Sequence, residues 1–173
     1  MNRIRNRRVA APLLALCVVA LVGGAALAQR QLKAASGRPE IKVELAGSVE
    51  RGGARLALDK VADVKPGEIL DWQIVSSNDG TGAARDYKAV GHIPVGTVLV
   101  AGSAAAESGS SVTYSIDGGQ TFSTQPVVEE RQADGSVKRV PAPVSMYTEV
   151  RYEWADAFAP GGKLSASYKV RVK

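Results

Sequence analysis

His92 is the only histidine of the chain, and imidazole is the commonest general base at neutral pH. Paired with a serine, it would support hydrolysis or acyl transfer, but no serine lies in the glycine pattern of a nucleophile elbow. Cys17 is the only cysteine, so metal sites built on histidine or cysteine clusters are excluded. No phosphate-binding glycine loop leads into a helix. We expect no catalytic, metal or cofactor residue, and we interpret His92 as a strand-end residue that hydrogen-bonds its surroundings.

The run from Ser115 to Phe122 has the composition of a tight hairpin turn. Its Asp117 carboxylate can accept backbone N–H groups of the turn, and Gly119 can adopt a positive φ. The run resembles the Asp-box hairpin of sialidase propellers, with Ser115, Asp117, Gly119 and Thr121 at the polar positions. That hairpin lies away from sialidase chemistry, so the resemblance implies a structural turn. Calcium binding stays open, although the run lacks the spaced carboxylates of an EF-hand loop.

Length and composition indicate one ordinary domain around a single core. The chain has 173 residues, of which 45% are hydrophobic, 23% charged and 5% aromatic. These values are typical of soluble globular proteins, so they disfavour wholesale disorder and a polytopic membrane protein.

The first 28 residues have the build of a secretory signal peptide. Four arginines among the first eight residues precede an apolar run from Val9 to Ala28, which ends in the small-residue site Ala26-Leu27-Ala28. Cleavage before Gln29 removes those arginines and lowers the formal net charge from +5 to +1. The remaining basic residues are interspersed with acidic ones, so we expect no nucleic-acid partner.

Two other fates of this segment stay open. The apolar run has about the length of a membrane helix and could remain as an uncleaved anchor. Lipidation at Cys17 would require a small residue before it, and Leu16 is not small. After cleavage the protein has no cysteine, and therefore no disulfide and no thiolate nucleophile. Residues 29–39 are polar and aperiodic, as expected of a short tether.

From residue 40 onward the hydrophobic pattern has the two-residue period of strands with one wet face. The alternating runs cover residues 41–45, 55–59, 70–74, 149–154 and 163–172. Glycine- and proline-rich turns separate them, and no window has a sustained helical period. We predict an all-β domain over residues 40–173, an immunoglobulin-like antiparallel sandwich of seven to nine strands. Trp72, Tyr152, Trp154 and Tyr168 should lie in or beside the core between its two sheets.

Residues 125–143 are interpreted as an inserted hairpin. Strands 127–133 and 136–140 flank Asp134-Gly135, a pair that favours a two-residue primed turn. Pairing outward from that turn sets Glu130 against Arg139 and Arg131 against Lys138. The charged segment is either a solvated insertion or a partner-binding finger. The residues that would form such a finger are Glu129, Glu130, Arg131, Lys138 and Arg139.

The order of several motifs resembles a conserved repeat domain of unknown function in bacterial and archaeal surface proteins. The motifs are Asn78-Asp79-Gly80, the run 92–97, Ala101-Gly102-Ser103, the run 114–119 and the run 159–162 before the last strand. The resemblance covers roughly residues 40–172. It implies an immunoglobulin-type fold and a spacer or adhesion role without catalysis. This chain differs in having one copy, His92 where an acidic residue is common, and the insertion.

Two functions follow as expectations. The first is a non-catalytic module, periplasmic or extracellular, that contacts another envelope protein in a structural or adhesive role through an edge strand or the hairpin. The second is a carbohydrate-binding module that presents Tyr87, Tyr147 or Phe158 to a sugar ring. Neither requires a cofactor, and the sequence leaves the oligomeric state open.

Overall fold

The structure is a computed structural model of the 173-residue chain, and it describes residues 37–107 and 109–173. The predicted signal peptide, Cys17 and tether residues 29–36 lie outside the described residues. Residues from Arg38 to Lys173 form one compact unit.

Antiparallel strands form nearly all the regular structure of the described residues, which confirms the all-β prediction. Eleven strands are found in this part of the chain, more than the seven to nine predicted, because several are short. They are β1 Ile41–Arg51, β2 Ala54–Ala57, β3 Ile69–Asn78, β4 Lys88–His92, β5 Thr97–Leu99, β6 Ala105–Ala106, β7 Ser110–Ser115, β8 Val127–Arg131, β9 Val137–Pro141, β10 Glu149–Trp154 and β11 Lys163–Val172. Two single-turn 3-10 helices, η1 Leu58–Lys60 and η2 Val144–Met146, complete the elements.

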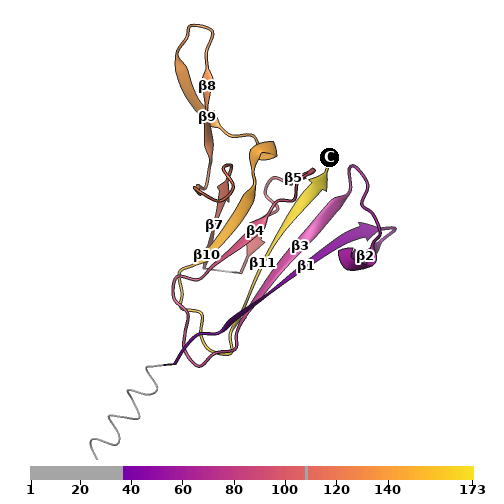
Figure 1. The fold of residues 1–173 in the computed structure, drawn as a ribbon, viewed down its shortest axis with the longest axis vertical. Coiled ribbons are helices and arrows are strands. Elements are labelled where there is room, and N and C mark those ends of the chain that lie inside the picture. Colours follow the sequence, from indigo (N-terminus) through magenta and orange to yellow (C-terminus); the bar gives the residue numbers. More distant parts are fainter. Residues whose placement is uncertain (1–36, 108) are drawn as a thin grey trace, which may run out of the picture. The chain divides into compact units, whose positions relative to one another are not determined.

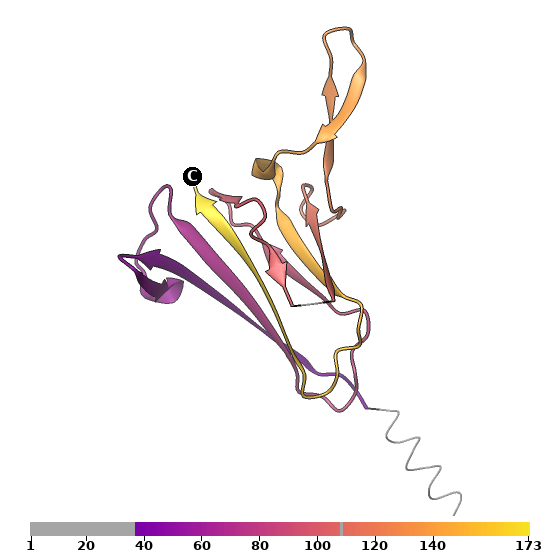
Figure 2. The ribbon, with the colours of Figure 1, turned by 180° about the vertical axis from the view of Figure 1, so that it is seen from behind.

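The strands form two main sheets and one separate hairpin (Figure 1). The larger sheet has the order β2-β1-β3-β11-β5, and β6 also pairs with β11. The smaller sheet has the order β4-β10-β7, and β8 and β9 pair with each other as a two-stranded sheet. The same three groups of strands can be distinguished from behind in Figure 2. The two longest pairings, β1 with β3 and β3 with β11, make β3 and β11 the centre of the larger sheet.

One hydrophobic core joins the two main sheets. Alternate residues of β10 and β11 point into it, as the two-residue period predicts. Tyr152 is 0% exposed, Tyr168 is 1% exposed and Trp154 is 5% exposed, while Trp72 packs against the core from its edge. The prediction that these four aromatic residues lie in or beside the core is confirmed.

Two tyrosine hydroxyls connect the sheets across this core. The Tyr168 hydroxyl, from β11, donates to the His92 carbonyl oxygen at the end of β4 at 2.6 Å. The Tyr152 hydroxyl, from β10, donates to the Ser167 carbonyl oxygen on β11 at 2.7 Å. Burial raises the pKa of Tyr168 to about 12 and also raises that of Tyr152. Both phenols therefore remain hydrogen-bond donors at neutral pH.

Gly91 makes room for one of these rings. A Cβ atom at Gly91 would lie 2.4 Å from Cε1 of Tyr168, well inside van der Waals contact. Because Gly91 has no side chain, the Tyr168 ring can lie close enough to β4 for its hydroxyl to reach the His92 carbonyl group.

The buried Asn78 side chain holds three segments together at the end of β3. Its Oδ1 atom accepts the backbone N–H groups of Glu40 and Gly80, at 3.1 and 3.2 Å. Its Nδ2 atom donates to the carbonyl oxygens of Gly82 and Phe158, both at 2.9 Å. All four hydrogen-bonding positions of the amide are used, and the residue is 0% exposed. The Asn78-Asp79-Gly80 turn is therefore a structural corner.

The core does not cover the whole of β1. Leu45 lies opposite the buried Ile74 in the β1–β3 pairing, and therefore on the same face, yet Leu45 is 58% exposed and Val43 is 54% exposed. The sequence pattern predicts a dry face for this strand. The smaller sheet has only three strands and leaves this part of the larger sheet exposed.

Candidate functional surfaces

The residues of the Asp-box-like run meet in one turn after β7. The Ser115 hydroxyl donates to Oδ1 of Asp117 at 2.7 Å and accepts the Gly119 N–H at 2.9 Å. Oδ1 of Asp117 also accepts the N–H groups of Gln120 and Thr121, at 3.0 and 2.9 Å. Gly119 has φ of 85°. The carboxylate thus organises the turn.

This network determines the protonation state of Asp117. The hydroxyl and backbone N–H of Thr121, together with the Ser115 hydroxyl, lower the pKa of Asp117 to about 2. The carboxylate accepts four hydrogen bonds and is ionised at pH values above this pKa. Such a group has little capacity to transfer protons near neutral pH. The turn therefore offers stability and shape.

The turn packs on the outer face of the smaller sheet. The Gly118 N–H donates to the Thr148 hydroxyl at 3.1 Å, just before β10. The Phe122 ring lies 4.0 Å from the guanidinium carbon of Arg151, in a cation–π arrangement. Arg151 also forms an ion pair with Glu153. These contacts fix the loop between β7 and β8 before the chain enters the hairpin.

His92 lies at the end of β4, and its side chain is 66% exposed. Its Nδ1 atom is 3.8 Å from Oε1 of Glu149, and its carbonyl oxygen accepts the Tyr168 hydroxyl. Among residues 37–107 and 109–173, no serine hydroxyl hydrogen-bonds to the imidazole, so the structure does not assemble a Ser-His pair there. The same residues contain no group of three or more histidine, cysteine, aspartate or glutamate side chains arranged to hold a metal ion.

The hairpin β8–β9 has buried residues at its base. Pro126 and Ala142 are buried at the two ends, and the Ala142 N–H donates to the Pro126 carbonyl oxygen at 2.8 Å. Beyond this clamp the side chains are mostly exposed, and the strands extend away from the two sheets in Figures 1 and 2. The five predicted finger residues, Glu129, Glu130, Arg131, Lys138 and Arg139, all lie on this ribbon and are exposed.

The hairpin register predicted from the sequence is wrong by one residue. The structure pairs Glu129 with Arg139, at 3.6 Å between charged atoms, and Glu130 with Lys138. The turn has three residues instead of two, because the Gln132 N–H donates to the Ser136 carbonyl oxygen and the Gly135 N–H donates back to Gln132. Both cross-strand charge pairs are therefore attractive, and the expected repulsion between Arg131 and Lys138 does not occur.

Asp134 and Gly135 explain the longer turn. The Asp134 carboxylate accepts the N–H and the hydroxyl of Ser136, at 2.9 and 2.6 Å, which lowers the pKa of Asp134. Gly135 has φ of 85°, the left-handed conformation that closes a three-residue hairpin loop. An Asp-Gly pair fits both loop lengths, so the sequence pattern does not distinguish them.

The three aromatic residues expected to meet a sugar are engaged in packing. Phe158 is 3% exposed, so its ring is not available without unpacking the core. Tyr87 packs between the Trp154 and Phe158 rings, at 5.6 and 5.1 Å between centroids, and its hydroxyl donates to Ser76. Tyr147 packs on another tyrosine ring at 5.0 Å.

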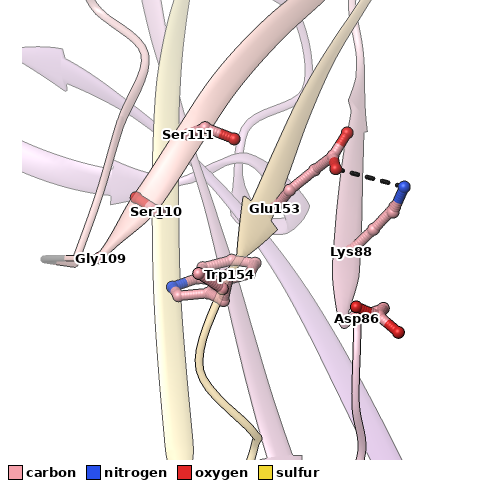
Figure 3. A pocket seen from close by; sticks show the side chains of 8 residues that line it. Asp86, Lys88, Gly109, Ser110, Ser111, Glu153 and Trp154 are labelled. Carbon is pink, nitrogen blue, oxygen red and sulfur yellow. Dashed lines mark ion pairs between the residues drawn. The ribbon is translucent and has the colours of Figure 1, made fainter.

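Sequence reasoning did not find a recess of about 410 Å³ at one end of the smaller sheet, shown in Figure 3. Its wall carries an ion pair between Lys88 of β4 and Glu153 of β10, at 3.2 Å. Asp86 precedes β4 with φ of 51°, unusual for a residue with a side chain. Trp154 lies at its base, but its indole nitrogen is buried and has no hydrogen-bond partner among the described residues. No periodic signal marks this site, because three separate strand ends build it.

Comparison with family models, with curated proteins and with solved structures gave no match. Among the helices of the described residues, none has the length and apolarity needed to cross a membrane.

Proposed function

We propose that this chain is an exported, non-catalytic envelope module that acts by contact with another envelope protein, in a structural or adhesive role. The observation that supports the proposal is the β8–β9 hairpin, whose strands pair with each other and with no other described strand, and whose side chains are mostly exposed. Side-chain area of this kind contributes nothing to the core of the domain. Projecting loops on a rigid scaffold are common binding elements.

The hairpin has two different faces, and one of them suits a protein partner. The register places Val127 and Arg131 of β8 on the same face as Val137 and Arg139 of β9. The two valines are 48% and 57% exposed. Arginine is enriched in protein interfaces, and exposed aliphatic side chains supply apolar area to bury. We therefore assign this face as the contact face. Glu129, which is paired with Arg139, lies on it as well.

Export and the finer fold belong to the same proposal. What supports export is the signal-like segment 1–28, since a cleaved signal peptide is typical of proteins of the periplasm or the cell exterior. What supports an immunoglobulin-like sandwich is a pair of antiparallel sheets that share one core, a six-stranded sheet that contains β1-β3-β11-β5 and a three-stranded sheet with the order β4-β10-β7. The chain order of the last three strands differs from that of immunoglobulin domains. Here β11 lies in the larger sheet, and β7 lies at the edge of the smaller one.

A pull-down from the native envelope with the purified mature chain tests the contact role. Replacing residues 127–140 by a short turn is feasible, because Pro126 and Ala142 are already joined by a hydrogen bond at the hairpin base. We expect the complete chain to capture a partner that the shortened chain does not, while both give the same β-type circular dichroism spectrum. Equal capture by both chains would contradict the proposal.

Val137 and Lys138 provide a matched pair of single substitutions. They are neighbours on β9, both are exposed, and their side chains point to opposite faces of the hairpin. Val137→Ser should weaken capture several-fold, whereas Lys138→Ser should leave it within error. The reverse order of effects would assign the contact to the other face.

A further inference from the structure

The outer edge of the larger sheet is incomplete along the first half of β1. Strand β2 pairs only with Ser48–Arg51 of β1. After Ala57 the chain leaves the edge as the 3-10 helix η1. Within the described part of the chain, residues 41–47 of β1 therefore pair on one side only, with β3.

The backbone groups that face this open edge are those of the odd-numbered residues. The Asp79 N–H donates to the Glu40 carbonyl oxygen at 2.8 Å, so Glu40 faces β3. N–H and C=O groups alternate sides along an antiparallel strand. Ile41, Val43 and Leu45 thus direct their N–H and C=O groups away from β3. An unpaired row of this kind is a template for another strand.

The side chains along the edge are apolar on one face and charged on the other. Val43 and Leu45 are 54% and 58% exposed on the face that continues the core side of the sheet. Lys42 and Glu44 lie on the opposite face, with side chains 64% and 67% exposed. An added strand would shield the two apolar side chains and bring its own charges beside Lys42 and Glu44.

The sequence of this edge is complementary to itself. In an antiparallel pairing centred on Val43, Lys42 of each copy lies opposite Glu44 of the other, and Ile41 lies opposite Leu45. The outward-facing backbone groups of Ile41, Val43 and Leu45 then meet each other in the correct alternation. Moving the register by two residues in either direction would set Lys42 against Lys42 or Glu44 against Glu44, which is unfavourable.

We propose that two copies of the chain form a symmetric dimer through antiparallel pairing of residues 41–45 of β1. A two-fold axis at Val43 makes the interface isologous, which is the commonest arrangement of homodimers. The partner at this edge is a second copy, because one register sets Lys42 of each copy opposite Glu44 of the other. This inference goes beyond the proposed function, since the dimer interface lies on β1 and does not include the β8–β9 hairpin.

Analytical ultracentrifugation of the mature chain at increasing concentration tests the proposal. We expect a concentration-dependent monomer–dimer equilibrium. Lys42→Glu or Glu44→Lys alone should raise the dissociation constant by roughly three- to tenfold, because each replaces two attractive cross-strand pairs by two repulsive ones. An equimolar mixture of these two variants should recover a dimer, since each supplies the charge that the other needs. Both substitutions are at exposed positions and leave the core unchanged.

Val43→Pro tests the backbone pairing separately. Proline removes the N–H group that faces the open edge and leaves the β1–β3 hydrogen bonds in place, so it is compatible with an edge strand. The Val43→Pro variant should be monomeric and should keep the circular dichroism spectrum of the wild type. The chain without the 127–140 hairpin should still dimerise, which separates this inference from the proposed function. A monomer up to about 1 mM, where even weak dimers are populated, would overturn the proposal. So would a dimer that none of the charge variants weakens.

Discussion

Replacing Asn78 by alanine should remove four hydrogen bonds made by one fully buried side chain. The change leaves the N–H groups of Glu40 and Gly80 and the carbonyl group of Gly82 without their side-chain partner, while the Phe158 carbonyl oxygen keeps the Ala84 N–H. An unsatisfied buried polar group costs about 1–3 kcal/mol, and partial access of water reduces the sum over these three partly buried groups. We expect a loss of roughly 3–5 kcal/mol, a large fraction of the roughly 5–15 kcal/mol that stabilises a typical domain.

Urea denaturation followed by circular dichroism measures this loss. Asp79→Ala is the matched control, because Asp79 is the next residue, is exposed and belongs to the same motif. The control should change the free energy of unfolding by less than about 0.5 kcal/mol. A loss below about 1 kcal/mol for Asn78→Ala would refute the interpretation of Asn78 as a corner that joins three segments.

Asn78→Asp adds a test with a pH dependence. The carboxylate keeps the acceptors for Glu40 and Gly80 but turns an ionised oxygen toward the carbonyl groups of Gly82 and Phe158. Burial and this repulsion should raise the pKa of the new carboxyl group above its unfolded value. The variant should therefore be least stable near neutral pH and gain stability relative to the wild type as the pH falls through the raised pKa. A destabilisation that is constant between pH 7 and pH 4 would contradict this reasoning.

Three further predictions concern the core and the turn after β7. Gly91→Ala should destabilise the domain by about 1–3 kcal/mol in urea denaturation, because the new methyl group would overlap the Tyr168 ring. Tyr168→Phe should cost about 1–2 kcal/mol through loss of the hydrogen bond to the His92 carbonyl group, and a change below 0.3 kcal/mol would show that water replaces it. The network lowers the pKa of Asp117 from its ordinary value of 3.8 to about 2 in the folded state. The stability that the ionised carboxylate adds is therefore fully present above pH 3.8 and is lost as the pH falls toward 2. The stability difference between the wild type and Asp117→Asn should shrink over that range, and a pH-independent difference would argue against a role for the charge.

Strand positions and the core were accessible from the sequence where the strands are covered on one face. β10 and β11 alternate strictly, and their inward-facing residues Tyr152, Trp154 and Tyr168 are buried as predicted. The same alternation in β1 is misleading, because Val43 and Leu45 remain exposed. Alternation reports which residues share a face. Whether another sheet covers that face depends on how many strands each sheet has, which local pattern does not determine.

The hairpin register and the recess show two other limits of sequence reasoning. The register depends on whether Asp134-Gly135 closes a two-residue or a three-residue loop, and both loops accept that pair. The bonds that decide it involve Gln132 and Ser136, which have no distinctive turn signal. The recess beside Trp154 is formed by the ends of three strands that are distant in the sequence, so it appears only when the tertiary structure is known.

The contact role of the hairpin is tested most directly by photo-crosslinking in the native envelope. A photoreactive amino acid placed at Val137, on the assigned contact face, should give one discrete adduct with another envelope protein. The same group at Val95, which is 100% exposed but lies in the turn between β4 and β5, should not give that adduct. No adduct from Val137, or the same adducts from both positions, would contradict a partner-binding hairpin.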